Sequence, residues 1–344
     1  MPWPARPTLR VLNDELEEDW EDRGHRHAAT QPEGKIAPPP FHLLAHPVVR
    51  HAAEVFTGVA GKAGDVKRES ISGLPAPVWW KFKTNRYRGA VYEDPDGQAW
   101  LCATGLRRKG DPDDFYKDFM AQVAGRGAGF YLPTEQDRGV LRVEQTGARL
   151  GDWEVEIQRL TRAGLQDAVA SGSAKFTLPE LTPPPATGAQ PEVVLGEAEV
   201  DVEVVQDDGD PDGAVAEIVV TVHGDRSRPA VLARAELVIL AAVNPDEQAW
   251  DPTYLADRRV YTCLLAVTDL RDLAARPAGP PGVTKPGATA HYALRGLLTE
   301  STVLGTAVRS MCGVWFVPRQ DADPLEKCGP CIALHRELER QADA

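Results

Sequence analysis

Three of the five cysteines form the pattern in this sequence that points most directly to chemistry. Cys328-Gly329-Pro330-Cys331 is a Cys-x-x-Cys pair, and Cys312 precedes Gly313 in an expected turn. A tight turn of this kind lets two thiolates hold one Zn²⁺, and the other two ligands of the tetrahedral site come from elsewhere in the chain. The glycines permit the backbone conformation that such a turn needs. The pattern therefore predicts a zinc site near the C-terminal end of the sequence.

Either of two histidines can supply the fourth ligand. His335 lies four residues after Cys331, on an expected helix over residues 332–339, and can reach back toward the turn. His291 lies upstream of all three cysteines, where the first ligand of a two-part zinc ribbon would be. The residues alone do not decide between the two histidines.

The predicted role of this site is structural. With four protein ligands, no coordination position stays open for a substrate or a water molecule. A redox Cys-x-x-Cys pair normally sits between a strand and a helix of a βαβ unit, whereas Cys312 and a histidine complete a metal site. Zinc binding stabilises small modules by about 10–16 kcal/mol in peptides, so we expect this module to depend on the metal for folding.

Residues 290–338 resemble a short actinobacterial family of unknown function that ends in a zinc ribbon. The matching residues are Ala290-His291-Tyr292, Thr299-Glu300-Ser301, Gly305-Thr306, Met311-Cys312-Gly313, Val314-Trp315-Phe316-Val317-Pro318-Arg319 and Cys328-Gly329-Pro330-Cys331. The resemblance implies that the zinc ligands are His291, Cys312, Cys328 and Cys331. The chain departs from the family pattern at Gly329-Pro330, where the family has its proline first.

Length and composition predict a cytoplasmic, multidomain α+β protein. The chain has 344 residues, enough for two or three domains. It contains no apolar run of about 18 residues and begins without the basic-then-apolar order of a signal peptide, so we expect no membrane partner. A net charge of −13 argues against non-specific binding along a polyphosphate surface. Arginine exceeds lysine and alanine is abundant, which suggests a GC-rich, actinobacterial genome.

Four segments are predicted along the chain. The first is acidic and proline-rich, which favours disorder, and the second has a helix beginning at Pro47 and a meander of strands joined by short turns. The segments are a disordered or extended tail (1–40), a unit of helix and three-stranded antiparallel sheet (41–125), a β-rich middle domain of mixed α/β character (126–277) and the zinc-ribbon module (288–340).

Within these segments, apolar patterns predict particular elements. Alternation of apolar and polar residues predicts strands, continuous apolar runs predict buried elements, and Asp111-Pro112 favours a helix start. The expected elements are strands over 78–83, 86–92 and 99–104, a helix after Asp111, a strand at Trp153–Ile157, a hairpin of 199–204 with 217–222, a helix over 229–243 and a buried strand over 259–267.

The meander carries an excess of basic side chains. Between Pro77 and Lys109 there are seven basic and three acidic residues, a local charge of +4. Such side chains can contact RNA and can stabilise the transition state of phosphodiester cleavage. Alternating basic residues also form the solvated face of an ordinary sheet. The candidates for catalysis or RNA contact are Lys81, Arg86, Arg88, Arg107 and Lys109.

Residues 41–123 also resemble the RelE/HigB class of toxins, which cut messenger RNA on the ribosome. The resemblance lies in the order of helix, Val78-Trp79-Trp80-Lys81-Phe82, Tyr87-Arg88, Leu101 through Lys109 and a short helix. The chain departs from the class at Thr104-Gly105-Leu106, where the toxins have His-Gly-Phe. The resemblance implies an RNA or ribosomal partner and an endonuclease activity.

Two functions therefore follow from the sequence. In the first, the chain is a nucleic-acid-binding or protein-binding factor with a structural zinc ribbon. In the alternative, it is a RelE-like, ribosome-dependent endonuclease with appended regulatory domains.

Overall fold

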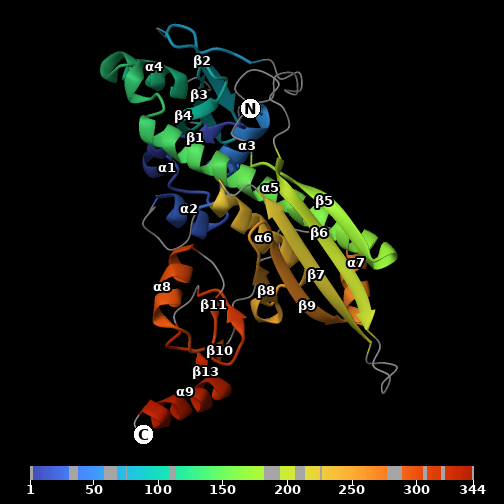
Figure 1. Cartoon of the computed structure of the whole chain (residues 1–344). Helices are drawn as coiled ribbons and strands as arrows, with labels where there is room; N and C mark the ends of the chain where they lie inside the picture. The colour runs from blue at the N-terminus through green and yellow to red at the C-terminus, as the bar shows by residue number, and fades with distance from the viewer. Residues whose placement is uncertain are drawn as a thin grey trace. The chain divides into compact units, whose positions relative to one another are not determined.

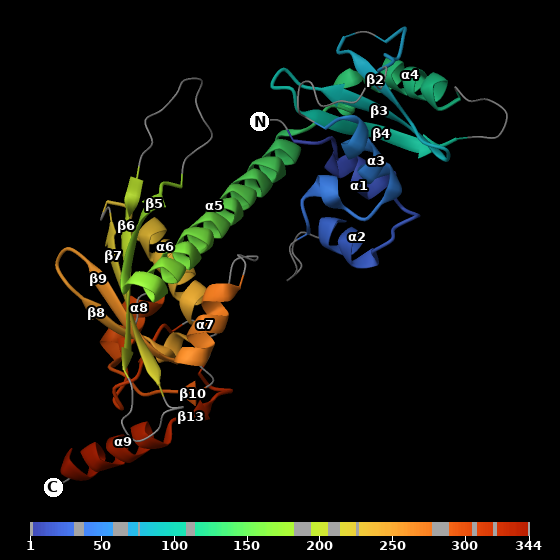
Figure 2. The same cartoon turned by 90° about the vertical axis from the view of Figure 1, so that its right-hand side faces the viewer.

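The structure is a computed structural model of α+β class (Figures 1 and 2). It describes residues 3–30, 38–57, 68–74, 76–107, 114–181, 194–205, 214–224, 227–276, 289–304, 308–318 and 322–342. The chain divides into two compact units, residues 1–146 and 147–344. In the described part of the chain, none of the helices combines the length and the apolar composition needed to cross a lipid bilayer.

The first unit is built around one four-stranded sheet. Its elements are β1 (Arg6–Pro7), α1 (Leu9–Asp14), α2 (Arg23–Thr30), η1 (Phe41–Leu43), α3 (Pro47–Val55), β2 (Trp79–Lys83), β3 (Tyr87–Glu93), β4 (Ala99–Leu106), α4 (Asp114–Arg126), η2 (Ala128–Phe130) and the first part of α5 (Glu135–Ser171). The strand order is β1-β4-β3-β2, and β1 pairs parallel to β4 while the other neighbours are antiparallel. The predicted meander is thus present as β2, β3 and β4, and the helices predicted at Pro47 and after Asp111 are α3 and α4.

Strand β4 organises this unit because its residues are apolar on both faces. Leu101 packs into a cluster with residues of α1 and α3, whereas Trp100 and Cys102 pack into a second cluster with α4. Successive side chains of a strand point to opposite faces, so one continuous apolar run supplies both cores. Strand β3, next to β4 in the sheet, is buried along most of its length as well.

The predicted disordered or extended tail is wrong for much of residues 1–40. Strand β1 extends the sheet, and helix α1 packs its buried Val11 and Leu12 into the cluster that contains Leu101. The sequence does not predict this helix, because it has few apolar residues and is followed by the acidic residues of 14–22. Residues 31–37, which belong to the same prediction, lie outside the described residues.

Arg6 and Glu144 form a buried ion pair that joins β1 to α5. Both guanidinium Nη atoms donate to the Glu144 carboxylate, at 2.6 and 3.0 Å, and Arg6 is fully buried beneath the rings of Phe41 and Trp100. Burial lowers the pKa of Arg6 and raises the pKa of Glu144, so pairing does not fully compensate either group for its loss of water. Replacing only one residue of this pair would therefore lower the free energy of unfolding strongly.

The second unit contains a five-stranded antiparallel sheet and the C-terminal metal-ligand region. The elements of the sheet part are the remainder of α5, β5 (Ser173–Pro179), β6 (Val194–Val205), β7 (Val215–Gly224), α6 (Pro229–Val243), η3 (Glu247–Ala249), β8 (Asp251–Tyr254), β9 (Arg259–Ala266) and α7 (Val267–Ala275). The strand order is β5-β6-β7-β9-β8, and Figure 2 shows α5, α6 and α7 on one side of this sheet. The predicted hairpin is β6–β7, and the predicted helix over 229–243 is α6.

The predicted strand at Trp153–Ile157 is wrong, because these residues lie within α5. Trp153 and Ile157 are four residues apart and pack with Leu165 and Ala168 into the core beneath the sheet. Their spacing follows the helical period over four turns, whereas a window of five residues shows only an alternation. The border between the two units also falls inside α5, after residue 146, and not near residue 125.

The C-terminal module, residues 289–342, consists of short elements. They are β10 (Thr289–Ala290), α8 (Arg295–Leu304), β11 (Val308–Arg309), β12 (Trp315–Phe316), β13 (Glu326–Lys327) and α9 (Gly329–Ala342). Two small sheets pair β10 with β13 in parallel and β11 with β12 in antiparallel orientation.

We predict that Glu144→Ala lowers the free energy of unfolding of the first unit by about 3–5 kcal/mol, because it leaves the Arg6 charge buried without its partner. Replacing both partners, Arg6→Met with Glu144→Leu, should recover most of this loss because no buried charge remains. Denaturant titration of the full chain measures both. Glu135→Ala, which removes an exposed ion pair with Arg142 on the same helix, is the control and should leave the midpoint unchanged. A Glu144→Ala variant as stable as this control would contradict the prediction.

Candidate metal centre

The parallel pairing of β10 and β13 brings the first two candidate ligands together. Thr289 pairs with Glu326 and Ala290 with Lys327, so the next residues, His291 and Cys328, leave the two strands at the same end. The backbone N–H of Cys328 donates to the carbonyl oxygen of Ala290 at 2.9 Å and extends this pairing by one bond. Residues 37 positions apart in the sequence are thereby held side by side.

The third candidate, Cys312, lies in the turn between β11 and β12. Gly313 has a φ of +95°, a conformation that suits glycine, and its N–H donates to the carbonyl oxygen of Ser310 at 3.0 Å. The N–H of Met311 donates to the carbonyl oxygen of Tyr292 at 2.7 Å. This bond fixes the turn beside the segment that carries His291.

The fourth candidate, Cys331, lies in the first turn of α9. The helix begins at Gly329, directly after Cys328, and the N–H of Ile332 donates to the carbonyl oxygen of Cys328 at 3.0 Å. Cys331 is 1% exposed and Cys328 is 8% exposed. Because unpaired N–H groups at the start of a helix favour negative charge, this position suits thiolates.

The ligand atoms of these four residues all lie within 4.8 Å of one another, so the cluster can hold a metal ion. The Sγ atoms of Cys312 and Cys328 are 3.8 Å apart, and the Nδ1 atom of His291 lies 3.3 Å from Cys312 Sγ and 3.7 Å from Cys331 Sγ. Tetrahedral Zn²⁺ with the usual bond lengths requires about 3.8 Å between two sulfurs and about 3.6 Å between sulfur and nitrogen. Both the donor set and its spacing fit such an ion.

The thiols differ in their tendency to ionise. Burial opposes ionisation of Cys312, but hydrogen bonds from the Ser310 hydroxyl and the Val314 N–H outweigh it and lower the pKa of the Cys312 thiol to about 6. At Cys328, the N–H of Cys331 favours the thiolate, yet burial and the two neighbouring thiols leave its pKa raised. Three sulfurs this close cannot all ionise without a positive charge between them. A divalent metal supplies that charge.

The imidazole of His291 is held from two further sides. The ring of Phe316 stacks on it, with centroids 5.7 Å apart and an interplanar angle of 28°. Its second nitrogen, Nε2, lies 3.1 Å from the side-chain amide of Gln248 in η3. Nδ1 therefore faces the cysteines while Nε2 faces the sheet part of the unit.

The alternative histidine, His335, lies outside this cluster. Its side chain is half exposed, with Nδ1 3.4 Å from the Glu339 carboxylate and its ring 5.1 Å from that of Tyr292. The structure thus brings together the residues that the sequence resemblance implied, and His335 points elsewhere.

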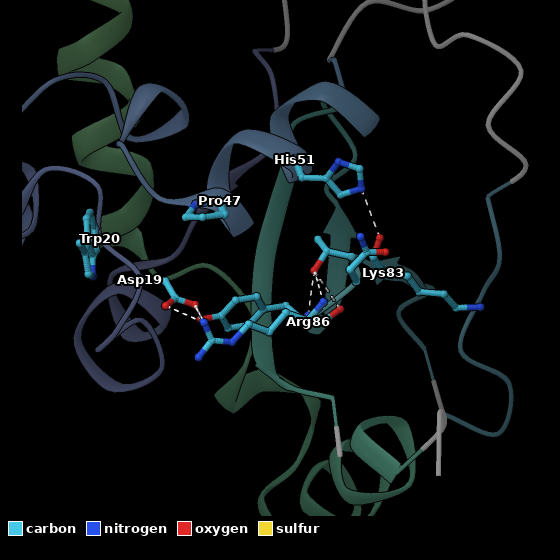
Figure 3. Close-up of a pocket in the computed structure, with 9 residues that line it drawn as sticks. Asp19, Trp20, Pro47, His51, Lys83 and Arg86 are labelled. Carbon is cyan, nitrogen blue, oxygen red and sulfur yellow. Dashed lines mark hydrogen bonds and ion pairs between the residues drawn. The ribbon is translucent and has the colours of Figure 1, made fainter. Parts of the chain in front are cut away.

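The candidate residues of the basic meander that the structure describes (Lys81, Arg86, Arg88 and Arg107) are not gathered in one place. Arg86 borders a hollow of about 980 Å³ in the first unit, where Figure 3 shows it turned toward Asp19 while Lys83 points away. The Arg86 guanidinium lies 2.6 Å from the Asp19 carboxylate, which also accepts a hydrogen bond from the Tyr87 hydroxyl at 2.5 Å. Burial and this bond raise the pKa of Tyr87 to about 12, so the hydroxyl stays protonated at neutral pH.

Among the other described candidates, Arg88 is buried, Lys81 is paired and Arg107 is exposed. Arg88 is 7% exposed and donates to the carbonyl oxygens of Thr84 and Tyr87, so it cannot face a substrate. Lys81 lies 3.8 Å from the Glu69 carboxylate, and Arg107 is exposed at the end of β4. Lys109 lies outside the described residues. Arg86 thus pairs with acidic residues of the segment that was predicted to be a tail.

Three residues around the metal cluster were not predicted. Ser310 lies only two positions before Cys312, so its contact with the Cys312 sulfur at 3.1 Å is local in the sequence. Phe316 lies in the segment that carries the resemblance and Gln248 lies outside it, and the contacts of both with His291 depend on the folded arrangement of distant segments.

The comparisons with known proteins concern this C-terminal region. Residues 285–338 match the model of a family described as "Protein of unknown function (DUF3039)". The match covers about one sixth of the chain and coincides with the region that resembled a small family of unknown function. No curated protein and no solved structure matches the chain.

We predict that the purified chain holds one equivalent of zinc, and that chelation unfolds residues 289–342 while the two larger sheets persist. The reason is that the module buries few apolar side chains, so short backbone pairings alone would not hold its ligand segments together. Metal analysis gives the stoichiometry, and hydrogen exchange measured by mass spectrometry gives the unfolded region.

Single ligand variants distinguish the two histidines. His291→Ala should lower zinc affinity strongly, whereas His335→Ala, the matched control, should retain the metal. Full zinc occupancy in a Cys328→Ser, Cys331→Ser double variant would contradict the ligand assignment.

Proposed function

We propose that this chain is a non-catalytic binding protein in which Zn²⁺, held by His291, Cys312, Cys328 and Cys331, folds a module that presents helix α9 to a protein partner. The ligand set is complete with four protein atoms, which suits a structural ion and leaves no position for a reacting group. The exposure of α9 is the observation that carries the proposal.

Helix α9 projects an apolar stripe that has no cover in the described structure. Every residue from Ala333 to Gln341 is exposed, and Leu334 and Leu338 are 44% and 54% exposed. These leucines follow Cys331 at helical positions i+3 and i+7, so they lie on the face that begins at the metal. Figures 1 and 2 show the helix at the C-terminal end of the chain, leading away from β13.

Such a helix gains little stability from the rest of the chain. Helices of this length are marginal in water and normally depend on packing of their apolar face. The ion pairs of Glu337 and Glu339 stay within α9. The metal fixes only the first turn, through Cys331, so a partner that covers the two leucines would supply the missing packing. This is the helix-in-groove mode of recognition.

Charge favours a protein over a nucleic acid as this partner. Residues 147–344 contain 18 basic and 30 acidic residues, a net charge of −12, whereas residues 1–146 carry −1. A polyphosphate would be repelled by the unit that contains the metal module. On α9 itself, Arg336 and Arg340 are balanced by Glu337 and Glu339.

We predict that a photo-crosslinking residue at position 338 forms a specific protein adduct in the native host, because this position lies on the apolar stripe. The matched position is 336, which lies half a turn away on the charged face and should give little adduct. Cys331→Ser should abolish the adduct at 338, since α9 then loses its anchored first turn. Mass spectrometry of the adduct identifies the partner.

Adducts with nucleic acid at either position, or equal protein adducts at 336 and 338, would contradict the proposal. Absence of any adduct at 338 in a zinc-loaded chain would contradict it as well.

A further inference from the structure

The short helix η3 is capped at its start and is attached to the core of the second unit at its end. The Asp246 carboxylate accepts the backbone N–H of Gln248 at 3.0 Å. After the helix, Trp250 is 4% exposed, belongs to the core beneath the five-stranded sheet, and donates its indole N–H to the carbonyl oxygen of Asn244 at 2.9 Å. Gln248 is therefore presented from a rigid support.

The side chain of Gln248 reaches the metal cluster through His291. Its amide nitrogen lies 3.1 Å from His291 Nε2, on the opposite side of the ring from the Nδ1 atom that faces Cys312 and Cys331. Phe316, which stacks on the same ring, belongs to β12, and β12 packs against η3. The imidazole thus lies between the cysteines and one amide of the sheet part.

A metal on Nδ1 determines what Nε2 must do. A neutral imidazole carries one proton, and a metal bound to Nδ1 leaves that proton on Nε2, which becomes a donor. The Gln248 amide oxygen and nitrogen exchange places by a half-turn of the amide group. After this half-turn, the oxygen lies where the Nε2 proton needs an acceptor.

We propose that Gln248 is a positioning residue of the metal centre, which accepts the His291 Nε2 proton, orients the ring for zinc, and ties the module to the five-stranded sheet. The inference rests on the proposed zinc site. Histidine ligands of metals commonly donate their other N–H to such an acceptor, and loss of the acceptor weakens metal binding by about 10- to 100-fold.

An amide suits this position because it serves both states of the histidine. Without metal, the proton can lie on Nδ1 and be donated to the Cys312 sulfur at 3.3 Å, while Nε2 accepts from the amide N–H₂. With metal, the proton lies on Nε2 and the amide oxygen accepts it. A carboxylate at this position would favour the metal-bound arrangement alone, and a methionine would favour neither.

The experiment measures zinc affinity of the full chain by competition with a chromophoric chelator, for the original protein and three variants. Gln248→Met keeps the length of the side chain but removes the acceptor, and we expect about 10- to 100-fold weaker binding. Gln248→Glu restores an acceptor and should bind zinc at least as tightly as the original. Gln341→Met makes the same change on exposed α9 and should have no effect.

Two readouts separate positioning from a general loss of structure. The absorption spectrum of the Co²⁺-substituted protein should change in Gln248→Met and return in Gln248→Glu, because it reports the ligand geometry. Thermal unfolding of the five-stranded sheet should be alike in both variants. Equal zinc affinity of Gln248→Met and the original, or equally weak affinity of both Gln248 variants, would overturn the inference. If the original chain itself binds no zinc, the proposed zinc centre fails instead, and the two failures are distinguishable.

Discussion

The C-terminal module has almost no apolar core of its own. Among its described residues, the buried apolar side chains are those of Val308, Cys328 and Cys331, and its strands are two residues long. So little burial cannot offset the entropy of ordering more than forty residues. The proposed zinc ion, which would join atoms from three segments, would supply the missing free energy. It would also fix the pairing of β10 with β13, the turn at Gly313 and the first turn of α9 in one step.

The rest of the chain folds around apolar cores. The folding of the first unit also determines which of its charged residues pair. In the first unit, α1 packs against the sheet and carries the acidic residues after it toward Arg86. The positive charge of the meander is offset by acidic residues elsewhere in residues 1–146, so this unit has a net charge of −1. The second unit therefore carries nearly all of the net negative charge of the chain.

The sequence predicted those features whose cause is local. The Cys-x-x-Cys turn is such a feature, and so is α6, whose continuous apolar run has the bounds expected for it. His291 required a resemblance, because its place beside Cys328 is created by strand pairing across 37 positions. The sequence does not predict α1, because its buried residues Val11 and Leu12 are few and have charged neighbours. It predicts a strand at Trp153–Ile157 because five residues do not show a helical period. Gln248 could not be found, because nothing near it in the sequence resembles a metal site.

The contact between η3 and His291 lies partly outside the segment that matches the family model. The family match begins at residue 285, so it includes every candidate ligand and excludes Gln248. A fragment cut at this boundary would carry the complete first coordination shell but would lose the amide that faces His291 Nε2 and the ring's link to the sheet. If the proposed role of Gln248 holds, such a fragment would keep the same candidate ligands and still bind zinc more weakly than the full chain.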